Sequence, residues 1–128
     1  MDDSVDKVLF DVFERECPSR ATLEHATGRW GLLALVALLD GTFGFNGLRR
    51  RVDGISEKML SQTLQALERD GLVLRNALTT IPPHVEYSLT ELGQEVAVKL
   101  HALIELLEGR MPLVMTARET YDAGRPSA

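Results

Sequence analysis

Residues 55–92 constrain the fold more than any other part of this chain. They open with an amphipathic helix expected over residues 57–70, with Ser56 as its N-cap and Gly71 as its C-terminal stop. The apolar residues that recur there at helical spacing and predict a buried stripe are Met59, Leu60, Leu64 and Leu67. A helix with one apolar stripe packs that stripe against the core and presents its polar side to solvent or to a binding partner.

A hairpin is predicted directly after this helix. Residues 72–78 and 85–89 have strand character, and Pro82-Pro83 lies at or near the tip between them. Thr90-Glu91 then opens a final long helix over residues 90–109, ended by Gly109 or Pro112. The remaining tail, Tyr121–Ala128, is expected to be frayed.

The N-terminal half reads as a series of short helices. Helical spacing predicts segments over residues 4–14, 18–27 and 29–39, and the last of these is apolar on nearly all faces and therefore central in the core. A one-bridge strand at Thr42 and Phe43 and a short helix over residues 45–52 follow.

The helices over 45–52 and 57–70 are joined by Asp53-Gly54, so they form a helix-turn-helix. With the hairpin added, the expected fold is a winged helix-turn-helix, α+β and mainly α, with dimerisation helices at both ends. Three parts are expected: an N-terminal helical arm (1–16), the winged helix-turn-helix (17–100), and the end of the dimerisation helix with the tail (101–128). In such a fold the second helix enters the DNA major groove while the hairpin, or wing, contacts the backbone.

The charge distribution fits this interpretation better than the net charge of −5 does. Residues 1–28 carry a net charge of −4, residues 29–84 carry +2 and residues 85–128 carry −3. The basic part is therefore the centre of the chain, between two acidic arms. The excess is small, and charge alone does not decide the function.

Several short motifs together resemble a known family. They are Cys17-Pro18, Gly28-Arg29-Trp30, residues 54–60 (GISEKML), Leu64, Leu67, residues 70–73 (DGLV) and residues 82–90 (PPHVEYSLT). The chain resembles the HxlR-type family of winged-helix transcriptional regulators, similar in architecture to the MarR type, over about residues 17–100. The resemblance implies a dimer on a near-palindromic operator and, in several members, sensing of oxidants or electrophiles at the position of Cys17. His84 stands where the family commonly has Arg, so the resemblance implies a weaker phosphate contact by the wing.

Polar residues on the outer side of the 57–70 helix are the expected DNA contacts. Those proposed from this helix are Ser56, Lys58, Ser61, Gln62, Gln65 and Arg69. The best candidates for bases are Lys58, Ser61, Gln62 and Gln65, because the N-terminal half reaches base edges and Gln can bond adenine through two hydrogen bonds. The alternative is a solvated polar face without a ligand.

Two further groups are expected to contact phosphates. Arg49 and Arg50, followed by Arg51, end the preceding helix, where they either meet phosphates or only stabilise the helix dipole. On or near the wing the candidates are Arg75, Thr79, Thr80 and His84. Pro82-Pro83 stiffens the loop and lowers its ordering cost. A plain hairpin without a DNA contact is the alternative.

Cys17 is the only cysteine, so an intrachain disulfide is impossible. It precedes a helix that begins with Pro18, where the helix dipole favours a thiolate, and Arg15 and Arg20 act in the same direction. The hypothesis is a redox or electrophile switch, through a sulfenic acid, a mixed disulfide or a bridge to Cys17 of the partner subunit. A buried cysteine acting as a small apolar residue is the competing interpretation.

Homodimerisation is expected through both ends of the chain. The apolar residues assigned to the interface are Val5, Leu9, Val12 and Phe13 in the first helix and Val96, Leu100, Leu103, Ile104 and Leu107 in the last. The alternative is that these helices fold back on their own domain. Trp30 and Phe43 are either plain core or the wall of a small-molecule pocket.

The sequence offers little for other functions. His25, His84 and His101 are scattered, and no metal-ligand spacing, phosphate-binding glycine loop or nucleophile elbow is present, so no enzyme, metal or cofactor is expected. With no secretory signal and no membrane-length apolar run, a cytoplasmic protein without membrane contact is expected. Two alternatives stay open: a small-molecule-responsive regulator with a structural Cys17, and a winged-helix adaptor for proteins.

Overall fold

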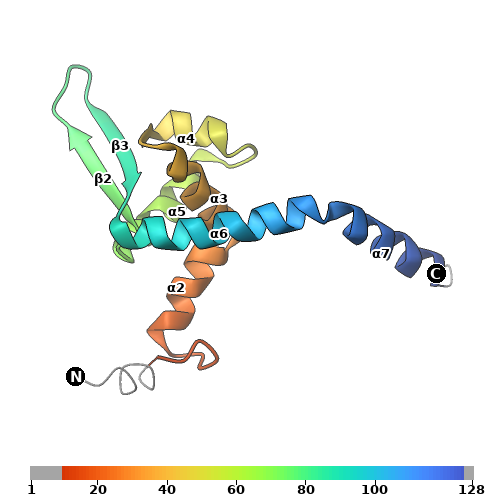
Figure 1. The fold of residues 1–128 in the computed structure, drawn as a ribbon. Helices are drawn as coiled ribbons and strands as arrows, with labels where there is room; N and C mark the ends of the chain where they lie inside the picture. The colour runs from red at the N-terminus through yellow and green to blue at the C-terminus, as the bar shows by residue number, and fades with distance from the viewer. Residues whose placement is uncertain (1–9, 126–128) are drawn as a thin grey trace.

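A computed structural model describes residues 10–125 of the chain. It is mainly helical, with one small antiparallel sheet in the strand order β1-β3-β2 (Figure 1). The helices and strands, in chain order, are α2 (Pro18–Thr27), α3 (Arg29–Ala37), the 3-10 turn η1 (Leu38–Asp40), β1 (Phe43–Gly44), α4 (Phe45–Arg51), α5 (Glu57–Arg69), β2 (Val73–Leu78), β3 (His84–Leu89), α6 (Glu91–Gly109) and α7 (Met111–Ala123). This is the expected winged helix-turn-helix.

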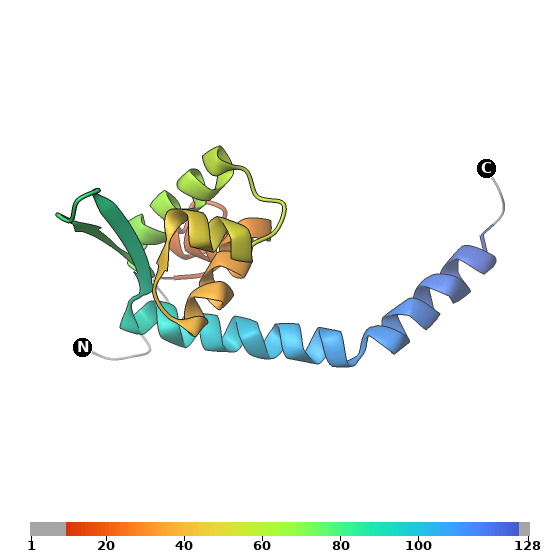
Figure 2. The same cartoon turned by 90° about the horizontal axis from the view of Figure 1, so that it is seen from above.

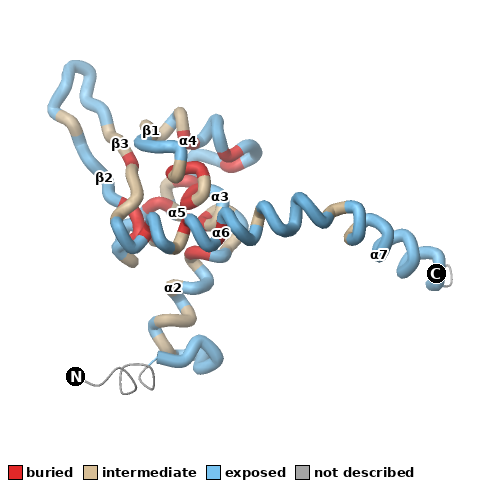
Figure 3. The backbone as a smooth tube through the Cα atoms, in the orientation of Figure 1, coloured by how far each residue is buried: buried red, intermediate tan, exposed pale blue. Residues whose placement is uncertain are grey.

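Helix α3 lies at the centre of the core. It packs against α2, α5 and α6, and its Ala34 and Leu35 have no exposed surface (Figure 3). Gly31 allows α2 to come close, because a Cβ atom there would lie 1.9 Å from the carbonyl oxygen of His25. The apolar sequence of this helix therefore has the central place that was predicted for it.

The helix-turn-helix is formed by α4, α5 and a turn in which Gly54 has φ +92°. The Ser56 side chain accepts a hydrogen bond from the Met59 N–H at 3.1 Å, which confirms its role as the N-cap of α5. Leu60, Leu64 and Leu67 are buried as predicted. The prediction for Met59 was wrong: it is 40% exposed, because the core-facing turn of α5 begins one residue later.

The wing consists of β2 and β3 and the loop between them. Its register runs from Val73 opposite Leu89 to Leu78 opposite His84. Strand β1 joins the other edge of β3 and pairs Phe43 with Tyr87, so the wing is anchored at its base beside α4. Figure 1 shows the hairpin projecting from the helical core.

Thr90 connects the wing directly to α6. Its hydroxyl accepts from the Gly93 N–H at 2.9 Å and donates to the Gly71 carbonyl at 2.6 Å, while its own N–H donates to the Leu72 carbonyl at 3.1 Å. Gly93 lies so close to Leu72 that a Cβ atom would meet that carbonyl oxygen at 1.9 Å. One residue therefore fixes the end of α5, the wing and the start of α6 together.

Two predictions at the ends of the chain need correction. Residues 10–16 form turns rather than the end of a helix over 4–14, because the Asp11 and Arg20 side chains bond backbone groups of Phe13 and α2 begins only at Pro18. The rest of that predicted helix lies outside the described residues. The tail was predicted to be frayed from Tyr121, but α7 continues to Ala123. Pro112 lies in the first turn of α7, where proline starts a helix rather than ending one.

Candidate nucleic-acid interface

Helix α5 presents a continuous polar face to solvent. Ser56, Lys58, Gln62, Gln65 and Arg69 are exposed, and Ser61 is half-buried. Ser56 is already used as the helix cap, which leaves its hydroxyl less suited to a base contact. The side chains best placed to reach base edges are Lys58, Gln62 and Gln65, at i, i+4 and i+7 on one side of the helix.

The arginines at the end of α4 have different surroundings. The Arg49 guanidinium donates to the Ile55 carbonyl at 3.3 Å and to the Glu57 carboxylate at 3.2 Å, so it braces the turn before α5. Arg51 lies 3.8 Å from the Asp40 carboxylate. Within residues 10–125, Arg50 has no hydrogen bond or ion pair and is exposed, which leaves it the most available of the three for a phosphate.

A cleft of about 540 Å³ separates α5 from the wing. Ser61 and Gln65 line one side, Arg75 lines the other, and the floor is apolar, formed by Leu64 and Tyr87 among others. Arg75 is therefore on the side of the wing that faces α5. Glu68 shares the cleft, so the positive charge of Arg75 is partly offset there.

The outer part of the wing is polar and exposed. The Thr80 hydroxyl donates to the Pro82 carbonyl at 2.8 Å and so helps to shape the tip, while Thr79 is exposed beside it. His84 lies 3.7 Å from the Glu86 carboxylate. Its ring lies beside Gly44, the residue before α4, where a Cβ atom would come within 3.0 Å of the ring. Because a carboxylate already faces His84, this residue is less available to a phosphate than Thr79 or Thr80.

Cys17 is half-exposed at the N-terminus of α2, next to the turn of residues 11–16. Its Sγ lies 3.2 Å from the Ser19 hydroxyl and accepts from the Asp11 N–H at 3.3 Å. The Ser19 hydroxyl lowers the pKa of the Cys17 thiol most, helped by the backbone N–H groups of Asp11 and Ser19.

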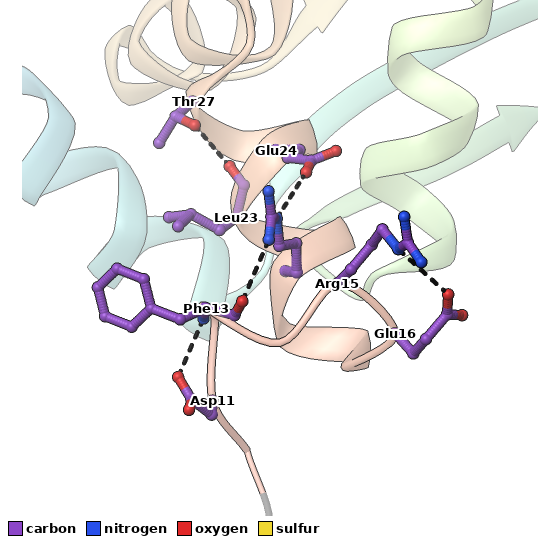
Figure 4. Close-up of polar contacts among 8 residues, drawn as sticks. Asp11, Phe13, Arg15, Glu16, Leu23, Glu24 and Thr27 are labelled. Carbon is purple, nitrogen blue, oxygen red and sulfur yellow. Dashed lines mark hydrogen bonds and ion pairs between the residues drawn. The ribbon is translucent and has the colours of Figure 1, made fainter.

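The two arginines near Cys17 in sequence do not supply the effect that was expected of them. Arg15 pairs with Glu16 at 3.6 Å, and Arg20 bonds Glu24 at 3.2 Å and the Phe13 carbonyl at 3.3 Å (Figure 4). Hydrogen bonds to the sulfur therefore replace the cationic neighbours that the sequence suggested. The lowered pKa itself agrees with the prediction.

The apolar stripe of α6 divides into an inner and an outer part. Leu100 is only 8% exposed and belongs to the core of its own chain, with Val96 packed against that core, so the interface role predicted for Leu100 is corrected to a core role. Leu103 and Leu107 are about half exposed, Ile104 is half-buried, and Val12 and Phe13 are exposed. Val5 and Leu9 lie outside the described residues.

Helix α7 extends away from the winged-helix core, and none of its residues is buried (Figures 2 and 3). It still carries large apolar side chains on its surface, among them Leu113, Met115 and Tyr121. The sequence interpretation missed this helix. The missed signal was Pro112, which suits the first turn of a helix.

Sequence reasoning also missed a contact between distant elements. His25 Nδ1 of α2 lies 2.6 Å from the Asp70 carboxylate, which caps α5. The two residues are 45 positions apart, so no local pattern could have paired them. The contact ties the helix that begins at Cys17 to the end of α5. Trp30 lines a smaller cavity of about 190 Å³ beside His25, and Phe43 packs against the core.

In residues 10–125 no group of three or more His, Cys, Asp or Glu side chains is arranged to hold a metal ion. No helix in that range is both long and apolar enough to cross a membrane.

Comparison with known proteins gives consistent matches. The family model described as HxlR-like helix-turn-helix matches residues 26–114. The uncharacterized HTH-type transcriptional regulator YtfH of Escherichia coli (strain K12) is 52% identical over 109 residues, which cover 85% of this chain and 86% of YtfH. A solved structure of ytfH from Salmonella typhimurium is 53% identical with a TM-score of 0.81, covering 86% of this chain and 98% of that chain. The redox regulator HypR in its oxidized form is 36% identical with a TM-score of 0.66, covering 73% of this chain and 96% of that chain.

Proposed function

This chain belongs to the HxlR-like helix-turn-helix family, and from that premise we propose that it represses transcription by binding a near-palindromic operator as a homodimer. Relatives such as YtfH are named HTH-type transcriptional regulators, so the chain is a transcriptional regulator with a helix-turn-helix for DNA binding. Repression, the operator symmetry and the dimer are the parts that need experiments.

The observation that carries the proposal is the polar face of α5 beside the wing. Lys58, Gln62 and Gln65 are exposed on the helix, and Arg75 faces Ser61 and Gln65 across the cleft. A helix of this kind can enter the major groove while Thr79 and Thr80 on the wing meet the adjacent backbone. The net positive charge of residues 29–84, between two acidic arms, supports DNA binding by this part of the chain.

The direct test is duplex binding to the intergenic region beside the gene that encodes this chain. We expect tight binding that weakens steeply as salt rises, because counterions released from phosphates return. A duplex of the same length and composition but shuffled sequence is the matched control. An adaptor for proteins would bind neither duplex, and equal affinity for both duplexes would contradict operator recognition. A reporter placed downstream should rise when the regulator is deleted; a fall would make it an activator.

The proposed dimer forms through the outer face of α6 and through α7. An isolated helix of fewer than about 12–15 residues is marginal in water, and α7 has 13 residues with none buried. Its apolar side chains, with Leu103 and Leu107 of α6, need a second copy to cover them. In a two-fold dimer the two α5 helices would lie about one helical turn of DNA apart, roughly 34–36 Å.

The proposed switch is Cys17. Its lowered pKa raises the thiolate fraction and thus its reactivity toward oxidants and electrophiles. The relative HypR is a redox regulator by name and has been solved in an oxidized form. Oxidation of wild type should change operator affinity, whereas Cys17→Ser should not respond. Identical responses of both proteins would contradict the proposed switch at Cys17 but would not contradict the proposed DNA binding.

A further inference from the structure

A separate cleft lies between α3 and α6 and shares no lining residue with the cleft between α5 and the wing. It has a volume of about 420 Å³, within the range of small-molecule sites, which are typically about 300–1,000 Å³. Its walls come from three elements: α3, the end of α4 with the turn that follows it, and the second half of α6. We call it the α3/α6 cleft.

The walls of the α3/α6 cleft combine apolar and ionisable side chains. Leu33 and Val36 of α3 face Ile104 of α6 across it, and Val52 closes the end beside the HTH turn. Val52 is buried, whereas Leu33 is 40% exposed, so an apolar surface remains open to an occupant. Burying such a surface removes apolar area from water and therefore favours binding.

The basic side chains at the rim of the cleft have ionic partners, whereas two of the acidic side chains do not. Arg51 is opposed by Asp40 at 3.8 Å, and His101 is bonded to Glu105 at 2.9 Å, so both basic groups already face a carboxylate. The side chains of the other two ionisable lining residues, Asp53 and Glu108, form no hydrogen bond or ion pair with any residue between 10 and 125. The uncompensated charge of the cleft is therefore negative, contributed by two different elements.

We propose that the α3/α6 cleft binds a small organic cation with an apolar body, such as a substituted ammonium compound. The apolar part would lie against Val36 and Ile104, and the cationic centre would lie toward Asp53 and Glu108. A carboxylate attracts an opposite charge most strongly where a low-dielectric wall limits screening. An anionic ligand of the same shape would meet these two carboxylates, while Arg51 and His101 at the rim already face carboxylates of their own.

Such a ligand would touch both halves of the regulator. Asp53 belongs to the turn that sets the angle of α5, and Glu108 belongs to the helix proposed for the dimer. Binding would therefore bias the position of the HTH motif relative to α6. This regulatory consequence rests on the proposed DNA-binding function, but the binding itself does not and is measured without DNA.

The test compares two soluble probes of matched size, benzyltrimethylammonium and phenylmethanesulfonate, by calorimetry or by amide shifts on α3 and α6. We expect the cation to bind more tightly than the anion, with shifts confined to the cleft. Asp53→Asn and Glu108→Gln should each weaken the cation by about twofold to fivefold, the range of an exposed ion pair. Glu95→Gln is the matched control, because Glu95 is an exposed carboxylate on the same helix outside the cleft.

Thermal melts of all variants show whether folding is unchanged; the exchanged side chains are exposed and keep their size. Equal affinity for cation and anion would overturn the proposal, as would equal effects of Glu108→Gln and Glu95→Gln. If the cation fails to bind and Glu108→Gln instead alters self-association, the cleft seats a second copy and the proposal is wrong. A cation that binds to a protein with no operator affinity would leave this site standing and remove the proposed function.

Discussion

At the scale of single residues, the side chains of α5 divide into those that build the helix and those that are free to bind. Ser56 caps it and Arg49 holds its approach through Ile55 and Glu57. The side chains of Lys58, Gln62 and Gln65 make no hydrogen bond or ion pair with the described part of the chain. Removing a member of the first group should therefore change stability, and removing one of the second should change DNA affinity.

The cap gives the first prediction. Ser56→Ala should lower the free energy of unfolding by about 1 kcal/mol, because the Met59 N–H loses its acceptor. Urea unfolding at one fixed protein concentration measures it. Ser61→Ala, on the same helix but without a capping bond, should change stability much less; an equal loss would contradict the role of Ser56.

The base-reading residues give the second prediction. Gln62→Ala and Gln65→Ala should each cost about 1–3 kcal/mol on the operator and little on a shuffled duplex, because base contacts carry the sequence information. Lys58→Ala should show which kind of contact Lys58 makes. A phosphate contact would weaken both duplexes alike and reduce the salt slope by about one. Fluorescence anisotropy across a salt series measures all three variants. Equal losses on both duplexes for the Gln variants would mean that they do not read bases.

The surroundings of Cys17 give the third prediction. Because the Ser19 hydroxyl lowers the thiol pKa, the alkylation rate by iodoacetamide should rise at a lower pH than that of an ordinary thiol. Ser19→Ala should move that rise to higher pH. Thr27→Ala, which removes a hydroxyl farther along α2 that bonds the Leu23 carbonyl, should leave the profile unchanged. A profile insensitive to Ser19 would assign the effect to the backbone alone.

At the scale of elements, close approaches of backbone decide where the helices lie. Gly93→Ala should destabilise the fold, because the new Cβ would clash with the Leu72 carbonyl oxygen at the junction of wing and α6. Gly109→Ala is the matched control on the same helix, with no atom within 4 Å of the new Cβ. It should be neutral or stabilising by up to about 1 kcal/mol, since alanine favours helix over glycine. Thermal unfolding compares the two, and similar shifts would contradict the tight junction.

Elements with a local sequence signal could be predicted from the sequence, whereas contacts between distant elements could not. Helices α3, α5 and α6 have strong local signals: an apolar run, a Ser cap with an apolar stripe, and a Thr-Glu start. The wing follows from its strand residues and Pro82-Pro83. The contact of His25 with Asp70 and the cleft between α3 and α6 join residues far apart in the chain, so no local pattern indicates them. Burial of Met59 was wrongly predicted because exposure at a helix start depends on the neighbouring elements. Helix α7 has no buried stripe, so only Pro112 in its first turn indicates it.

At the scale of the whole molecule, the surface of α6 and α7 predicts the assembly. Leu106→Glu should shift the protein from dimer to monomer, because Leu106 is 57% exposed on α6 and a buried charge would oppose its burial against a partner. Light scattering after size-exclusion chromatography measures the mass. Leu74→Glu is the control, since Leu74 is similarly exposed but lies on β2. A dimer that survives Leu106→Glu would place the interface elsewhere.

The junction at Thr90 has a mechanical consequence. With 19 residues, α6 is about 28 Å long, so a tilt of about 5° at its base carries its far end through about 2–3 Å. The wing is the short arm of the same lever, because a single residue separates it from the long one. A second subunit or an occupant of the α3/α6 cleft could displace the far end of α6. We expect such a displacement to rotate the hairpin, because no flexible linker separates the two elements.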